Sequence, residues 1–236
     1  MFMKILGVDS TATAASAAVL VNDKIVALNY SNTGLTHSQT LLPMIEGVLK
    51  SAGVSVDELD CIAVSNGPGS FTGVRIGVSA VKGIAQPLNI PCVSVSTTEV
   101  IAKPLEGAGC YAVSVMDARC NQVYTAQFDC SQGFERITPD EAITIDELGE
   151  QLKGVSKPVV LIGDGTRVAY NKLKDVVPDI RAAGPSVVYQ SAADVCAIAA
   201  ERLSSGEDAS SAPHDVLPNY LRLSQAEREL KKKNNN

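Results

Sequence analysis

Residues 65–77 read SNGPGSFTGVRIG, a run with Gly67, Gly69 and Gly73 around Pro68 and no lysine. An apolar run at 61–66 precedes it and predicts a buried strand, and the residues that follow predict a helix over 72–88. A glycine-rich turn from a strand into a helix can cradle a phosphate, because the N–H groups at the helix start attract anions. Without a Gly-Lys-Ser/Thr ending, however, the stretch is a weak phosphate signal. The alternative is a tight turn whose glycines permit close packing.

The helix predicted over 72–88 is apolar around more of its circumference than the stripe of about 100° that a helix lying on a sheet needs. Its polar side chains form one narrow stripe: Arg75, Ser79, Lys82 and Gln86. A flank of small residues lets another backbone come close: Gly73, Gly77 and Ala80. The partner could be the helix predicted over 36–53 or a helix of another protein, and periodicity alone does not separate the two.

The helix predicted over 36–53 has an apolar face and a defined end. The residues on that face follow helical spacing: Leu41, Ile45, Val48 and Ala52. Gly53 is a reasonable C-terminal stop. Pro43 either sits in the first turn, where its missing N–H costs little, or bends the helix.

A strand–turn–strand plan occurs twice, at residues 4–21 and 111–128, with Asp9 and Asp117 at the two turns. The repeat predicts two related lobes that divide around residues 102–109. Aspartate is also common in ordinary turns, so either hairpin alone is ambiguous. Strands alternate with helices elsewhere, which predicts an α/β fold with a mixed sheet in each lobe. The segments in this alternation include a strand leading into a helix at 92–102, a strand at 158–165 and a helix at 191–203.

The composition argues against several classes of protein. The chain has 236 residues, a net charge of −6 and a pI near 5.0, whereas a free-standing nucleic-acid binder normally shows a basic patch. The dense basic run at 231–233 lies in a tail that we expect to be disordered. There is no signal-peptide core, no membrane-spanning run and no Cys-x-x-Cys pair among the six cysteines, so we expect a reduced, cytoplasmic protein.

Catalytic side chains are sparse. The two histidines, His37 and His214, are far apart in the sequence, and neither has a second histidine at helical spacing. No Gly-x-Ser-x-Gly or His-Glu-x-x-His motif is present. The sequence therefore identifies no nucleophile and no metal site.

The first hairpin turn nevertheless resembles the first phosphate loop of sugar kinases and actin-like ATPases. The residues of this loop are Asp9, Ser10 and Thr11. Residues 161–167, LIGDGTR, could form a turn on the nucleotide side, although an ordinary strand-end turn fits them better. Asp9 and Asp117 could supply two carboxylates, so a phosphotransferase is not excluded.

Five stretches together resemble the bacterial TsaB family, also called YeaZ. They are MKILGVDST (3–11), HSQTLLPMI (37–45), NGPGSFTGVRIG (66–77), DARCNQVY (117–124) and PNYLR (218–222). The resemblance runs from Met3 to about Arg222, and GPGSFTGVR is its most specific piece. It implies a two-lobed ASKHA fold, related to actin, Hsp70 and the sugar kinases. The implied parts are an N-terminal lobe at 1–104, a C-terminal lobe at 105–224 and a charged tail at 225–236.

The resemblance also implies a function. It makes the chain a non-catalytic subunit, required with the transferase TsaD and the ATPase TsaE for adding a threonylcarbamoyl group to adenosine 37 of tRNAs that read ANN codons. TsaD carries a metal-binding His-x-x-x-His, whereas this chain has His37 and Leu41 at those positions, so we expect no metal and no catalytic residue here. ATP and metal are expected in the complex with TsaD, and tRNA only through that complex. The alternative is an ASKHA-type phosphotransferase or a glycoprotease-like hydrolase.

The resemblance places the binding of TsaD, and of a second copy in a homodimer, on the helices at 36–53 and 72–88. The partner-binding residues expected on these helices are His37, Leu41, Ile45, Val48, Gly73, Arg75, Ile76, Gly77, Ala80 and Ile84. The phosphate loop at the first hairpin turn is then a remnant without a catalytic role. Gln39 and Gln122 stand where the family usually has Glu, which removes a charge at each position.

Overall fold

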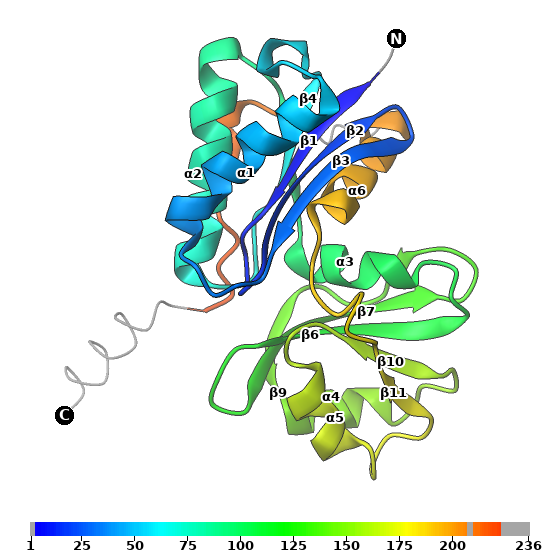
Figure 1. The fold of residues 1–236 in the computed structure, drawn as a ribbon. Helices are drawn as coiled ribbons and strands as arrows, with labels where there is room; N and C mark the ends of the chain where they lie inside the picture. The colour runs from blue at the N-terminus through cyan, green and yellow to red at the C-terminus, as the bar shows by residue number, and fades with distance from the viewer. Residues whose placement is uncertain (1–2, 207–209, 223–236) are drawn as a thin grey trace, which may run out of the picture.

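The computed structural model describes residues 3–206 and 210–222, which form two β-sheets with helices packed against them (Figure 1). The strands of the first sheet are β1 (Lys4–Asp9), β2 (Ala15–Val21), β3 (Lys24–Ser31), β4 (Cys61–Ser65), β5 (Cys92–Val95) and β12 (Ser210–Ser211). The strands of the second sheet are β6 (Cys110–Asp117), β7 (Gln122–Cys130), β8 (Glu135–Arg136), β9 (Glu141–Thr144), β10 (Val159–Ile162) and β11 (Ile180–Ala182). The helices are α1 (His37–Ala52), α2 (Phe71–Leu88), α3 (Thr97–Ala102), α4 (Ile145–Leu152), α5 (Thr166–Leu173) and α6 (Ala192–Ser204), with 3-10 turns at Val56–Glu58, Lys103–Leu105 and Pro213–Asp215.

The two sheets share one strand order, as the repeated hairpin predicts. That order is β5-β4-β1-β2-β3 in the first sheet and β11-β10-β6-β7-β8 in the second. In the first sheet β5, β4 and β1 pair in parallel and the remaining pairs are antiparallel, and β11, β10 and β6 repeat this arrangement in the second. The prediction of an α/β fold with a mixed sheet in each lobe is confirmed.

The helices α1 and α2 lie side by side over one face of the first sheet, and α6 covers the other face (Figure 1). Strand β1 shows how the two cores separate, because successive side chains of a strand point to opposite faces. Leu6 and Val8 pack under α1 and α2, whereas Ile5 packs toward α6. Each face of the sheet is therefore buried by its own helices.

The ends of α1 and α2 follow from their capping residues. Gly53 adopts the left-handed conformation (φ +65°) after α1, as the predicted stop requires. Helix α2 begins after Ser70, whose hydroxyl accepts a hydrogen bond from the Gly73 N–H at 3.3 Å, and ends at Asn89. Pro43 lies in the second turn of α1, which excludes one of the two alternatives, a place in the first turn.

The chain returns to the first sheet after the second sheet is complete. Helix α6, which the predicted division assigns to the lobe at 105–224, packs instead on β1 and β2, and the Ala192 N–H donates to the Ser16 hydroxyl at 2.8 Å. Strand β12 then pairs with β5. The assignment of α6 was wrong because an amphipathic helix does not show in its own sequence which of two sheets it covers. The predicted tail at 225–236 lies outside the described residues.

Asp140, in the second lobe just before β9, joins three segments at the junction of the lobes. Its carboxylate accepts hydrogen bonds from the Ser96 hydroxyl at 2.8 and 2.9 Å and from the Thr98 hydroxyl, both at the start of α3. It also pairs with the Arg136 guanidinium at 2.9 Å and accepts from the Asn219 amide at 3.4 Å. One carboxylate therefore holds α3, the β8–β9 connection and the C-terminal segment together.

The cysteines pack as small apolar side chains. All six are free; Cys120 is exposed and the other five are buried. Throughout residues 3–206 and 210–222, no helix is both long enough and apolar enough to cross a membrane.

Candidate docking surface and remnant phosphate loop

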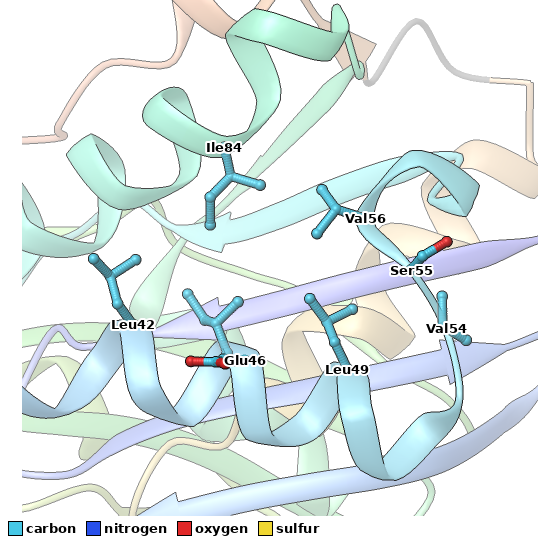
Figure 2. Close-up of a pocket in the computed structure, with 8 residues that line it drawn as sticks. Leu42, Glu46, Leu49, Val54, Ser55, Val56 and Ile84 are labelled. Atoms are coloured by element: carbon cyan, nitrogen blue, oxygen red, sulfur yellow. The ribbon is translucent and has the colours of Figure 1, made fainter.

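An apolar groove of about 500 Å³ lies between α1 and α2. Figure 2 shows Leu42 and Leu49 of α1 pointing toward Ile84 of α2, with Val56 closing one side. The lining residues are Leu42, Ile45, Glu46, Leu49, Val54, Ser55, Val56 and Ile84. Leu42 is 55% exposed, so this apolar side chain of the groove is open to solvent. The groove is therefore an apolar surface suited to receiving another chain.

Five of the ten predicted partner-binding residues lie at the surface of these helices. They are His37, Arg75, Ile76, Ala80 and Ile84, of which Arg75 is exposed and the others are half-buried. The other five are buried within this chain: Leu41, Ile45, Val48, Gly73 and Gly77. Gly73 and Gly77, which were expected among the partner-binding residues, lie on the face of α2 that points into this chain.

The small residues of α2 make room for the chain's own first hairpin turn. A Cβ atom on Gly73 would lie under 3.0 Å from the backbone oxygen of Ser10, and one on Gly77 would lie 2.7 Å from the Ser10 hydroxyl oxygen. The Ser10 hydroxyl also donates to the Gly73 carbonyl at 2.9 Å. The backbone that comes close to α2 is therefore the turn between β1 and β2. Gly83, by contrast, has open space around its Cα.

The glycine-rich turn between β4 and α2, called the glycine loop below, covers the first hairpin turn, where the sequence resembles a phosphate loop. Asp9, Ser10 and Thr11 are all buried. The Ser70 N–H donates to the Thr11 carbonyl at 2.7 Å, and a Cβ atom on Gly69 would collide with that same carbonyl. The glycines thus permit two stretches of backbone to pack together, which is the alternative to a phosphate cradle.

Asp9 stabilises the hairpin turn in which it lies. Its carboxylate accepts hydrogen bonds from the Thr11 N–H at 3.0 Å and from the Thr11 hydroxyl at 3.1 Å. Burial raises the pKa of Asp9, and the polar groups of Ser65, Thr11 and Gln190 oppose that rise. The Asp9 side chain is fully buried and is not exposed to solvent in the structure.

The second predicted carboxylate has a different environment. Asp117 is exposed and accepts the Arg119 N–H at 2.8 Å, while the Asp117 N–H donates to Asp164 at 3.0 Å. Burial is the main reason that the pKa of Asp164 is raised. In the part of the chain that the structure describes, no group of three or more His, Cys, Asp or Glu side chains could hold a metal ion.

His37 and Leu41, which stand at the positions compared with the metal-binding His-x-x-x-His of TsaD, make structural contacts within this chain. The His37 Nε2 atom lies 2.7 Å from the carbonyl oxygen of Ala12, which joins the start of α1 to the first hairpin turn. Leu41 is buried in the core beneath α1. Both residues therefore stabilise the first lobe.

The C-terminal strap, residues 213–222, runs along α2 and the glycine loop. Lys82 donates to the carbonyls of His214 at 2.9 Å and Val216 at 3.1 Å. The Asn219 N–H donates to the Asn66 carbonyl at 2.7 Å, and a Cβ atom on Gly67 would collide with the Asn219 carbonyl. The glycine loop is thus packed between the first hairpin turn and the strap.

Tyr220 of the strap adds a residue to the surface that the sequence did not place there. Its ring stacks on Phe71 with 4.6 Å between ring centroids, and its hydroxyl accepts a hydrogen bond from Arg75 Nε at 2.8 Å. The stretch PNYLR was a recognisable motif, but nothing in it indicates contact with a helix 145 residues earlier in the chain.

Comparison with known proteins gives consistent results for sequence and for structure. The family model of TsaD, tRNA N6-adenosine threonylcarbamoyltransferase, matches residues 31–230. The tRNA threonylcarbamoyladenosine biosynthesis protein TsaB of Bacillus subtilis is 30% identical over 227 residues, which are 95% of this chain and 96% of that protein. The structure of YeaZ from Pseudomonas aeruginosa has a TM-score of 0.75 at 26% identity and covers 92% of this chain and 100% of its own. Component A of (R)-2-hydroxyglutaryl-CoA dehydratase from Acidaminococcus fermentans is similar in fold alone, with a TM-score of 0.50 at 15% identity, covering 86% of this chain and 99% of its own.

Proposed function

Because this chain belongs to the TsaB (YeaZ) family and takes part in the biosynthesis of threonylcarbamoyladenosine in tRNA, we propose that it is a non-catalytic partner subunit of the TsaD transferase. Its two lobes have the ASKHA fold. The observation that supports a non-catalytic role most directly is the sealed loop at the first hairpin turn, where Asp9 is buried and bonded to Thr11. A phosphotransferase would need that loop open to a substrate.

The groove between α1 and α2 is the part of the surface that we assign to TsaD. Leu42 and Ile84 line it, and burying such side chains against a partner is favourable at roughly 25 cal/mol per Å² of apolar area. The half-buried Ile76 and Ala80 continue the same face of α2. A second copy of the chain would compete for the groove if it binds there.

The other components follow from the same proposal. TsaE would join as the third protein, and ATP and metal would belong to the complex rather than to this chain. The net charge of −6 disfavours tRNA binding by the chain alone, so tRNA would be held mainly by the partner. The complex would work in the cytoplasm.

The proposal is tested with a substitution in the groove and a matched one outside it. Leu42→Glu places a charge in the apolar groove, whereas Val168→Glu changes a residue of similar exposure (52%) on α5 in the other lobe. We expect Leu42→Glu to weaken TsaD binding by at least roughly 100-fold, because a buried unpaired charge costs several kcal/mol. Val168→Glu should bind as the native protein does.

Binding is measured by titration calorimetry, and activity by threonylcarbamoyl transfer to tRNA in a mixture containing TsaD and TsaE. Transfer should require this chain and should fall with Leu42→Glu. Two results would contradict the proposal: transfer or ATP turnover by the purified chain alone that Asp9→Ala abolishes, or native TsaD affinity in a folded Leu42→Glu protein.

A further inference from the structure

Glu46 is the one ionisable side chain among the eight residues that line the groove between α1 and α2. Figure 2 shows it on α1 between Leu42 and Leu49, about one helical turn from each. Ile84 lines the groove from α2, and the remaining lining residues are apolar apart from Ser55. Glu46 is exposed, so water solvates its carboxylate in the chain alone.

This chain supplies no positive charge to Glu46. Among the residues that the structure describes, no lysine, arginine or histidine forms an ion pair with it. Lys50, one turn further along α1, is exposed and makes no such pair, and Lys82 of α2 donates to carbonyl groups of the C-terminal strap. The groove therefore carries a negative charge that its own lining residues leave unneutralised.

A partner that covers the groove takes water away from this carboxylate. Covering the apolar side chains is favourable, but removing an ionised carboxylate from water is costly unless a cation compensates for the lost hydration. A partner with a basic side chain above Glu46 avoids that cost, and a purely apolar partner does not. A second copy placed groove to groove would bring another Glu46 and no cation from its lining residues. The charge of the groove thus favours a different protein over a second copy.

We propose that Glu46 selects the partner in this groove by pairing with a lysine or arginine side chain of TsaD. This inference rests on the proposed function and adds the charge that TsaD must present at one point of the docking surface. Leu42, Leu49 and Ile84 supply apolar contact area. Glu46 supplies specificity, because charge complementarity discriminates between partners whose apolar surfaces are similar.

The test replaces Glu46 in three ways and measures TsaD binding by titration calorimetry at low and high salt. Glu46→Gln removes the charge and nearly keeps the shape, so we expect binding weaker by roughly 10-fold, with less dependence on salt. Glu46→Lys opposes two like charges and should weaken binding by roughly 100-fold. Glu46→Leu enlarges the apolar surface, yet it should also weaken binding, because the basic side chain of the partner is then covered without a counter-charge.

Glu135→Gln is the matched control. Glu135 lies on β8 in the second lobe, is exposed, and forms no ion pair among the described residues. This variant should bind TsaD as the native protein does. A melting temperature is measured for each variant, and it should stay almost unchanged because both glutamates lie at the surface. Glu46→Gln decides the matter if Glu46→Lys does not fold.

Three results would overturn the inference. If Leu42→Glu prevents binding while Glu46→Gln and Glu46→Lys bind TsaD within twofold of the native protein, the groove is the docking site and Glu46 does not select the partner. If Glu46→Leu tightens binding, TsaD presents no cation to this carboxylate. If neither Leu42→Glu nor Glu46→Lys changes the affinity, TsaD does not dock in the groove and the proposed function fails as well.

Discussion

Replacing Gly73 by alanine tests the close packing between α2 and the first hairpin turn. The new Cβ atom would lie under 3.0 Å from the backbone oxygen of Ser10, which cannot rotate away as a flexible side chain could. Overpacking of this kind costs typically 1–3 kcal/mol, and the better helix propensity of alanine returns up to about 1 kcal/mol. We therefore expect the free energy of unfolding to fall by about 1–2 kcal/mol. At this chain length, that corresponds to a melting temperature lower by roughly 2–8 °C.

Gly83→Ala, in the same helix, is the matched control. Among the described residues, and apart from the neighbouring backbone of α2 itself, no atom lies within 4 Å of the Cβ that it would add, so only the gain in helix propensity remains. We expect that variant to be more stable by about 0.5–1 kcal/mol. Unfolding in urea, followed by circular dichroism, measures both variants. If Gly73→Ala is as stable as the native protein, Ser10 does not approach α2 as described.

Two further substitutions probe the charged groups inside the fold. Burial raises the pKa of Asp194 to about 7, and Lys103 opposes that rise. The folded protein therefore binds the proton of Asp194 more tightly than the unfolded chain does. The free energy of unfolding consequently falls as the pH rises from about 4 to about 7. Asp194→Asn should therefore be more stable than the native protein by roughly 1–2 kcal/mol at pH 8 and no more stable at pH 4; a difference that does not change with pH would contradict this assignment. Asp140→Ala removes the acceptor shared by Ser96, Arg136 and Asn219, so amide hydrogen exchange in the C-terminal strap should become at least several-fold faster, and unchanged exchange there would show that Asp140 does not hold the strap.

Local signals in the sequence predicted the first lobe well. Helix α1 lies within one residue of its predicted bounds at each end. Its C-terminal end was predictable because Gly53 stops the helix in the left-handed conformation. The hairpins at 4–21 and 111–128 are present, and their repetition is visible in the strand order of both sheets. Helix α4 was missed although Thr144 and Glu147 form a capping box at its start, since eight residues are too few for periodicity to stand out.

The candidate site was harder to predict because it is built from segments distant in sequence. The spacing of Gly73 and Gly77 indicated correctly that a backbone comes close to α2, but it did not tell a neighbouring helix from the turn at Ser10, 63 residues earlier. The stack of Phe71 on Tyr220 is equally invisible to local patterns. Only the exposed polar stripe that begins at Arg75 followed from periodicity alone.

The return of the chain to the first sheet has a consequence for the order in which the protein is made. When residues 1–104 have left the ribosome, the strands β1, β2, β4 and β5 are present, but the face that α6 covers, with Ile5 and Leu20, has nothing to cover it. The strap that packs against α2 is translated after the strands and α-helices of both lobes. The first lobe is thus synthesised first but completed only after the second lobe. Until α6 is made, the nascent chain exposes an apolar face of the first sheet. A partner that recognises α2 with the strap packed against it can thereby distinguish a complete chain from an unfinished one.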